Sequence, residues 1–439
     1  MQVEHDILAQ SAVADDAAHL PALRFLTAGG VDDGKSTLIG RLLLDSRALL
    51  ADQLDAVGHG SDGSLLAQLT DGLEAEREQG ITIDVAYRYF ATPRRKFVIA
   101  DAPGHEQYTR NMVTAAAGSD CAVVLVDVTK LELAQRPPRL LAQTRRHALL
   151  AQLLRVRSIV FVVNKLDAVD EPHAAFDAVH EALREFARGA GIEPVGVIPI
   201  SALHADNVVH AASRWPWWSG PSLLQLLETL PAGEAAADGS LLLPVQYVAR
   251  GHASSRSPQR VLWGRVARGD VRVGQQLRVY PGGHEAGVAE LWHAGVRVER
   301  CSAGSSAGVV FDQHLDVSRG DWLTDAGRAP RVAREFDATL AWLDSEPVVL
   351  GRKYWLRHGH AWVAARIVQV HARLDIHSLQ RVEADALKAN DIGRVRVQAQ
   401  AELPLAGYVD NRVAGGMILV DAQSHRTSGA LLVDAAPGS

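Results

Sequence analysis

The chain has 439 residues, of which 47% are hydrophobic and 22% charged, and its mean hydropathy is −0.01. This composition is ordinary for a soluble globular protein, so it excludes a collagen-like chain and argues against long disorder or a membrane protein. The 45 basic and 51 acidic residues leave a net charge of −6, and there is no run of Lys and Arg of the kind that predicts a nucleic-acid partner.

Length, cysteine content and the first residues set further expectations. At about 150 residues per domain, the length predicts roughly three domains. Two cysteines cannot build a disulfide framework, and Cys121 lies inside an apolar run, so we expect buried thiols in a reducing compartment. The first 20 residues lack the basic and apolar regions of a secretory signal, and no apolar run approaches a bilayer span. We therefore expect a cytoplasmic protein with no membrane partner.

The first half of the chain alternates short apolar runs with longer stretches of helical length. Runs at 97–100, 122–126 and 159–163 are strand-sized and carry no charge. Apolar strands separated by helices are typical of a mostly parallel sheet buried between helices. The sequence therefore predicts an α/β domain over 22–231.

A phosphate-binding loop follows the first predicted strand. Residues 29–36, GGVDDGKS, match G-x-x-x-x-G-K-[ST] between a predicted strand at 24–28 and a predicted helix at 36–44. In such a loop the backbone N–H groups point at phosphates, Lys35 reaches the β- and γ-phosphates, and the Ser36 hydroxyl binds Mg²⁺. The predicted phosphate-binding residues are Gly29, Asp32, Asp33, Gly34, Lys35, Ser36 and Thr37.

Two further segments are expected near the phosphates. Asp101 ends an apolar run in the motif DAPGH, where its carboxylate can hold Mg²⁺ through water and the Gly104 N–H can sense a γ-phosphate. Residues 76–84 lie where a switch loop should be, and the Thr82 hydroxyl is expected to meet Mg²⁺ only when a γ-phosphate is present. The predicted metal ligands are therefore Ser36, Thr82 and Asp101.

A base-recognition motif completes the predicted site. In NKLD at 164–167, the Asn164 amide can pair with a purine edge, and the Asp167 carboxylate can accept from two donors of guanine that adenine lacks. Lys165 lies between them, and Ser201, Ala202 and Leu203 follow the apolar run 197–200. An ATPase would not need this carboxylate. The phosphate loop, DAPGH, NKLD and residues 201–203 are four motifs in the order that predicts a guanine-specific P-loop GTPase, which binds GTP and Mg²⁺.

The second half of the chain has a different pattern of polar and apolar residues. A small, acidic, turn-rich stretch at 231–240 predicts a linker, and the residues after it alternate in polarity without helical periodicity. About 200 residues of β structure exceed one small barrel, and a break at 325–330 divides them. We therefore predict three domains: a GTP-binding domain at 22–231 and β-barrels at 241–328 and 329–434.

These motifs resemble those of translation-factor GTPases of the elongation factor Tu and 1A group. Within that superfamily, the sequences at 31–43, 71–88, 101–114 and 143–147 are similar to those of one family. This is the sulfate adenylyltransferase subunit 1 family, the GTPase subunit of bacterial heterodimeric ATP sulfurylase. The resemblance implies an elongation-factor-Tu-like fold, an α/β P-loop domain followed by two barrels. It also implies that His105 orients the attacking water, and that Val31 and Ile81 form an apolar gate before it.

The resemblance further implies a function for the whole chain. Members of this family couple GTP hydrolysis to the formation of adenosine 5′-phosphosulfate and pyrophosphate from ATP and sulfate. A separate small subunit performs the adenylyl transfer, and this chain has no S-G-G-x-D-S pyrophosphate loop. The expected partner is that small subunit, in a heterodimer or higher assembly. No second G-K-[ST] follows Lys165, so we expect no adenylylsulfate kinase.

Alternatives remain for the function and for three local features. A translation-elongation GTPase that binds aminoacyl-tRNA is the main rival, and a regulatory GTPase that drives no chemistry is the second. The apparent insertion at 131–141, with Pro137 and Pro138, predicts an exposed loop that is either neutral or part of a partner surface. The tryptophans at 215–218 predict a packing corner rather than a base-stacking platform. His358 and His360, expected on one strand face, could ligate zinc but lack further ligands.

Overall fold

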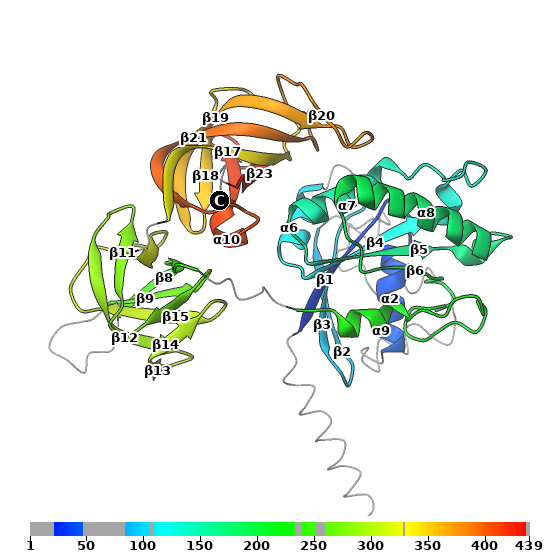
Figure 1. The fold of residues 1–439 in the computed structure, drawn as a ribbon, viewed down its shortest axis with the longest axis horizontal. Coiled ribbons are helices and arrows are strands. Elements are labelled where there is room, and N and C mark those ends of the chain that lie inside the picture. The colour runs from blue at the N-terminus through cyan, green and yellow to red at the C-terminus, as the bar shows by residue number, and fades with distance from the viewer. Residues whose placement is uncertain are drawn as a thin grey trace, which may run out of the picture. The chain divides into compact units, whose positions relative to one another are not determined.

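The computed structural model describes residues 22–46, 84–105, 109–232, 239–250, 260–327 and 330–435. These residues form two compact units (Figure 1). One unit contains the described residues up to 232 together with 376–379, and the other contains the remaining described residues. The bounds of the three predicted domains stay predictions, because both barrels fall within the second unit.

The first unit is built on a six-stranded sheet with the order β2-β3-β1-β4-β5-β6. Every neighbouring pair is parallel except β2 and β3, which are antiparallel. The central strands β4 and β5 are buried along their whole length, which explains their unbroken apolar sequence. The strands are β1 (Leu23–Ala28), β2 (Ala86–Ala91), β3 (Lys96–Asp101), β4 (Cys121–Asp127), β5 (Ser158–Asn164) and β6 (Gly196–Pro199).

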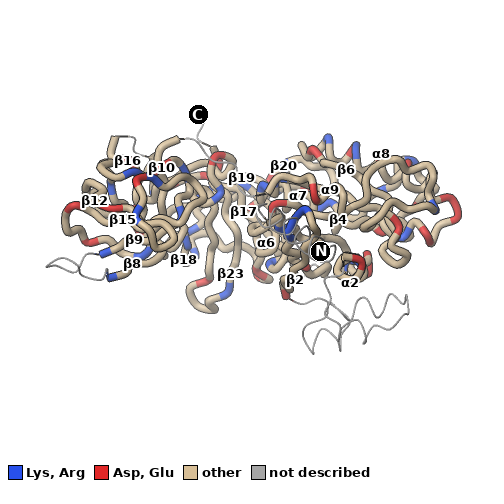
Figure 2. Tube along the Cα trace, turned by 90° about the horizontal axis from the view of Figure 1, so that it is seen from below, with Lys and Arg blue, Asp and Glu red and all other residues tan. Residues whose placement is uncertain are grey.

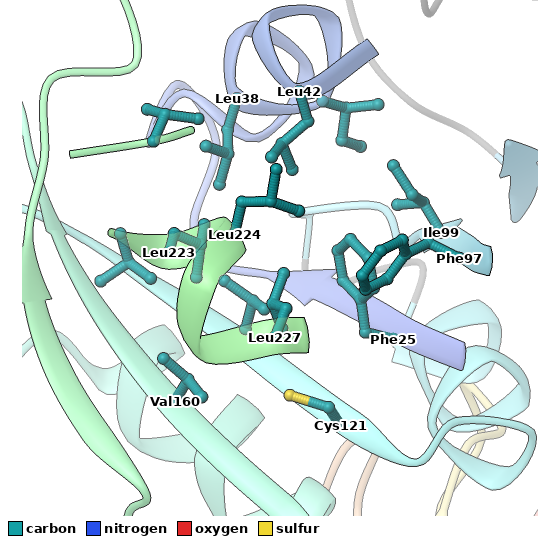
Figure 3. Close-up of a cluster of buried hydrophobic side chains, with 14 of the residues drawn as sticks. Phe25, Leu38, Leu42, Phe97, Ile99, Cys121, Val160, Leu223, Leu224 and Leu227 are labelled. Atoms are coloured by element: carbon teal, nitrogen blue, oxygen red, sulfur yellow. The ribbon is translucent and has the colours of Figure 1, made fainter. Parts of the chain in front are cut away.

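Helices cover both faces of this sheet (Figure 1). Leucines of α2 and α9 pack on one face against side chains such as Phe25 and Phe97 (Figure 3). On the opposite face α6 contacts β1, and α7 contacts β4 and β5. The α-helices are α2 (Lys35–Asp45), α6 (Thr109–Ala117), α7 (Ala142–Leu153), α8 (Pro172–Ala190) and α9 (Leu223–Thr229), and two 3-10 helices are η2 (Val128–Lys130) and η3 (Leu166–Ala168).

The tryptophan cluster before α9 packs against α8. Trp215 is buried, its ring lies 6.0 Å from that of Trp217, and the Trp217 ring lies 5.5 Å from Phe176 of α8. The Trp218 ring meets Phe176 edge-on at 5.7 Å. Aromatic pairs at these distances stabilise a packed corner. The predicted packing role is confirmed.

The first barrel of the second unit is an antiparallel sheet in which β7 also bonds to the residues that follow β9. Its strand order is β7-β16-β11-β12-β15-β9-β8, with β13 beside β12. The N–H of Leu242 donates to the carbonyl of Arg268, and the N–H of Ala267 donates to the carbonyl of Leu242. The strands are β7 (Leu242–Pro244), β8 (Tyr247–Arg250), β9 (Arg260–Arg265), β10 (Asp270–Arg272), β11 (Gln276–Tyr280), β12 (Glu285–His293), β13 (Val296–Val298), β14 (Arg300–Ser302), β15 (Ser306–Phe311) and β16 (Trp322–Asp325).

The second barrel is closed. Its strands follow the order β18-β22-β23-β17-β21-β19, and β19 pairs back with β18. Alternate residues of these strands point inward and form one apolar core that includes Leu340, Leu356 and Leu419. Its elements are β17 (Arg331–Trp342), β18 (Lys353–His358), β19 (Ala361–Leu374), β20 (Arg381–Val382), β21 (Ile392–Leu405), α10 (Arg412–Gly415), β22 (Gly416–Asp421) and β23 (Thr427–Val433).

Three other expectations meet the structure. Residues 131–141 contain no helix or strand and are mostly exposed, which confirms the predicted loop. The expectation that His358 and His360 share a strand face is wrong, because β18 ends at His358 and the chain turns at Gly359 with φ of 57°. Both cysteines are buried and unbridged, as predicted. Within the described residues, no helix is long and apolar enough to cross a membrane.

Candidate nucleotide site

The predicted motifs meet at one edge of the α/β sheet. Asp101, Asp127 and Asn164 are the last residues of β3, β4 and β5, and the phosphate loop follows β1. These strands are parallel neighbours, so their carboxyl ends lie together. In open α/β sheets this edge is where ligands bind.

The phosphate loop has the backbone that its glycines predict. Asp32 and Gly34 have φ angles of 59° and 90°, and α2 begins directly after Gly34. A Cβ atom on Gly34 would lie 2.4 Å from Nδ2 of Asn164, so any other residue there would be strained and would displace the Asn164 amide. The loop therefore directs the N-terminus of α2 toward the site.

Lys35 lies inside the loop rather than on the surface. Its side chain is 7% exposed, and Nζ donates to the carbonyl of Gly30 at 2.7 Å. Burial lowers the pKa of Lys35, while the carboxylates of Asp101 and Asp33 oppose that shift. A buried ammonium group facing backbone carbonyls is arranged to meet phosphate oxygens.

The loop after β3 lies against this lysine. A Cβ atom on Gly104 would lie 2.5 Å from Nζ of Lys35 and 2.8 Å from the Gly30 carbonyl. Oδ1 of the buried Asp101 accepts from the Thr27 hydroxyl at 3.1 Å. His105 follows and is half-buried. The structure thus brings Asp101 and Gly104 to the phosphate loop.

Asn164 connects the phosphate loop to the predicted base pocket. Its Nδ2 donates to the carbonyl of Asp33 at 2.8 Å, and its Oδ1 accepts from the N–H of Ala202 at 3.0 Å. The amide has two N–H groups, and one of them is assigned to the loop. The Ser201 hydroxyl in turn accepts from the N–H of His204 at 3.1 Å, while Leu203 is partly exposed.

Lys165 and Asp167 of the NKLD motif each contact a titratable side chain. The backbone of Lys165 has a φ angle of 64°, and its Nζ lies 2.7 Å from Oδ2 of Asp127. Oδ2 of Asp167 lies 3.7 Å from the His204 imidazole. The Asp167 side chain is mostly buried, so its carboxylate is held near the site edge.

Two groups of residues near the site did not figure among the predicted site residues. Asp127 ends β4 and Lys130 ends η2 directly after it, and Lys130 forms an ion pair with Asp33 at 2.8 Å. The signal was present, because a carboxylate and a rare lysine follow an apolar strand at the same sheet edge. On α7, Gln143 donates to the Gly104 carbonyl at 3.1 Å and lies 2.9 Å from Nε2 of His147.

The donor chemistry at this edge suits Mg²⁺. The Ser36 hydroxyl, half-buried in the first turn of α2, and the Asp101 carboxylate are hard oxygen ligands. Among the described residues, no group of three or more His, Cys, Asp or Glu side chains could hold a metal by itself. An ion held partly by phosphates needs fewer protein ligands. Ile81 and Thr82 lie outside the described residues, whereas Val31 and Thr37 are half-buried.

Comparison with known proteins gives the family. The Elongation factor Tu GTP binding domain family matches residues 21–233, and the GTP-eEF1A C-terminal domain-like family matches residues 335–434. Sulfate adenylyltransferase subunit 1 of Laribacter hongkongensis is 39% identical, and the match covers all of this chain and 91% of that protein. The protein of the same name from Cronobacter sakazakii is 41% identical over 94% of this chain and 86% of its own length.

A longer relative is also similar. The bifunctional enzyme NodQ of Azospirillum brasilense is 43% identical over 94% of this chain, and the chain spans 66% of its length. The two proteins named sulfate adenylyltransferase subunit 1 are matched over most of their own length at a similar identity, so family membership is judged from them. The chain therefore belongs to the sulfate adenylyltransferase subunit 1 family of GTP-binding enzyme subunits.

Proposed function

We propose that the chain hydrolyses GTP and that this hydrolysis drives formation of adenosine 5′-phosphosulfate and pyrophosphate from ATP and sulfate. Family membership over the whole chain carries the proposal. In the driven reaction a sulfate oxygen attacks the α-phosphorus of ATP and pyrophosphate leaves. A separate small subunit performs this step, as partner in a heterodimer or higher assembly in the cytoplasm.

The residues of the nucleotide site have distinct proposed roles. Lys35 and the N–H groups of the phosphate loop bind the phosphates, and Asn164 with Asp167 selects guanine. Lys165, Ser201, Ala202 and Leu203 shape the base pocket. When bound, Mg²⁺ neutralises charge on the β- and γ-phosphates, and Ser36, Thr82 and Asp101 would hold it.

Hydrolysis depends on a positioned water. We assign His105 to orient it, and Val31 with Ile81 to form an apolar gate that keeps the imidazole away until the partner closes the switch. His105 directly follows Gly104, whose carbonyl is held by Gln143 of α7. Catalysis by such a site is mainly positioning and charge stabilisation, to which Lys35 and the backbone amides contribute most.

A translation-elongation function is the second candidate, because both matched domain families are translation-factor families. Two observations weigh against it: the chain belongs to a sulfate adenylyltransferase family, and its basic and acidic residues are interspersed in the described part (Figure 2). Binding of tRNA that weakens steeply with salt would favour this candidate.

The deciding experiment combines the chain with its small subunit. Alone, the chain should hydrolyse GTP slowly and make no phosphosulfate from ATP and sulfate. After co-purification with the small subunit, phosphosulfate formation should rise with GTP and should not rise with a non-hydrolysable analogue. Robust phosphosulfate synthesis by the chain alone would overturn the assignment. Equal stimulation by the analogue would show a regulatory GTPase that drives no chemistry.

A further inference from the structure

Lys130 is the last residue of η2, which directly follows β4, and it contacts the phosphate loop. Its Nζ is 2.8 Å from Oδ1 of Asp33 and donates to the backbone carbonyl of Val31. It also lies 3.8 Å from Oδ2 of Asp127. Lys130 is one of six lysines in a chain that otherwise uses arginine, and three of the six, with Lys35 and Lys165, lie at this site.

Asp33 needs this cation. The Asp33 side chain is 1% exposed, and its Oδ2 accepts from the N–H of Gly30 within the loop. A carboxylate removed from water is tolerated when it is paired and hydrogen-bonded. Among the residues that the structure describes, Lys130 is the cation that forms an ion pair with Asp33. Removing Lys130 would leave a buried negative charge inside the phosphate loop.

The same network continues to the base-recognition motif. Asp127 has no exposed side-chain surface, and its Oδ2 lies 2.7 Å from Nζ of Lys165. Its Oδ1 accepts from the N–H and hydroxyl of Thr129, which fixes the carboxylate at the end of β4. Asp127 therefore lies between two lysines. Lys130 of η2 pairs with the phosphate loop, and Lys165 belongs to the NKLD motif.

We propose that Lys130 is a positioning residue that ties the phosphate loop to the base-recognition motif through Asp33 and Asp127. The inference rests on the proposed function, because it assumes a guanine nucleotide at this edge. Lys130 itself touches no phosphate in this scheme. By holding Asp33 and the Val31 carbonyl, it keeps the loop amides aligned before nucleotide arrives, so binding requires less ordering of the loop.

The first test compares Lys130→Met with Lys130→Arg in the full chain. Dissociation constants for fluorescent GDP and for a non-hydrolysable GTP analogue should rise about tenfold in K130M, because a buried carboxylate loses its partner. K130R keeps the charge and should bind within about threefold of wild type. The single-turnover rate of bound GTP should change less than the affinity. Lys96→Met, an exposed lysine at the start of β3, is the matched control.

A second variant pair separates this role from general stability. Asp33→Asn removes the charge that Lys130 neutralises, so the double variant D33N/K130M should bind GDP better than the sum of the two single losses predicts. Additive losses, or K130M affinities equal to wild type, would overturn the proposal. Should K130M not fold, the double variant D33N/K130M should still fold and bind GDP, because it leaves no unpaired buried carboxylate, and its failure to do so would also overturn the proposal. Failure of wild-type protein to bind guanine nucleotide would instead contradict the proposed function.

Discussion

His147 is a buried imidazole that links α7 to the loop after β3. Its side chain is 1% exposed, and Gln143 bridges its Nε2 and the Gly104 carbonyl. Burial, helped by the charges of Lys35 and Arg146, lowers the pKa of His147 from 6.5 to about 3. The imidazole is therefore neutral at physiological pH, and its Nε2 accepts while the proton sits on Nδ1.

This neutral histidine predicts acid sensitivity of the first unit. Between pH 6.5 and 3 the unfolded chain binds a proton at His147 that the folded chain does not, so the free energy of unfolding falls as the pH falls. From pH 7 to pH 5 this histidine should cost about 2 kcal/mol. His147→Gln should remove that loss and leave the remaining pH dependence unchanged.

Urea titrations at pH 7 and pH 5, followed by circular dichroism at the helix band, measure this effect. Within the described residues, all helices longer than α10 lie in the first unit, so the helix signal reports that unit. His173→Gln is the matched control, because its side chain on α8 is 58% exposed. Equal pH sensitivity of wild type and H147Q would show that His147 is not held neutral by burial.

At the scale of elements, α9 shows how a local signal fixes a core helix. Ser222 accepts from the N–H of Gln225, and the Gln225 side chain accepts from the N–H of Ser222, which is a capping box. The Ser222 hydroxyl also donates to the Val209 carbonyl at 2.8 Å. This cap starts the helix whose leucines cover one face of the sheet (Figure 3).

Ser222→Ala should therefore destabilise the first unit. The variant loses the cap and leaves the Val209 carbonyl without its donor, at a cost of about 1–2 kcal/mol. Thr229→Ala, at the exposed end of the same helix, should change stability by less than about 0.5 kcal/mol. Urea denaturation read at the helix band separates the two. A cost for S222A no larger than that for T229A would contradict the capping role.

The α/β sheet could be predicted because its strands are buried on both faces. Such strands have continuous apolar sequences, and their ends are marked by Asp101, Asp127 and Asn164. The edge strand β2 was missed, because Tyr87 and Tyr89 are exposed and Phe90 is its one buried residue in the structure. A strand with so little apolar signal gains its place from antiparallel pairing with β3.

Pairings between strand ends could not be predicted. Lys130 and Asp33 are separated by 97 positions, and Gln143 and Gly104 by 39, so no local pattern joins them. The lack of further ligands already disfavours zinc at His358 and His360, but no local sequence pattern shows the turn at Gly359 that separates them. In the structure Nε2 of His358 lies 2.9 Å from the Ala414 carbonyl, and its ring stacks on Trp322 at 4.7 Å.

At the scale of the whole molecule, the two barrels of the second unit contact each other through a small buried patch. Leu242, Ala267 and Trp322 of the first barrel pack with Ala414 of α10 in the second barrel. Asn411 crosses the contact: its Nδ2 donates to the Ala267 carbonyl at 2.7 Å. Its Oδ1 also caps α10 by accepting from the N–H of Ala414 at 2.8 Å.

Substitution of Asn411 tests whether this contact makes the two barrels unfold together. Asn411→Ser keeps a helix cap but loses the bond to Ala267, whereas Asn411→Ala loses both. Because Asn411 is buried, we expect N411A to cost about 2 kcal/mol and to lower the melting temperature of this unit by about 5 °C. N411S should lower the melting temperature by part of that amount, and Gln400→Ala, at an exposed residue of β21, should melt like wild type. Differential scanning calorimetry reads both outcomes. A loosened contact should broaden or split the barrel transition, and an N411S transition identical to wild type would show that the bond to Ala267 does not couple the barrels.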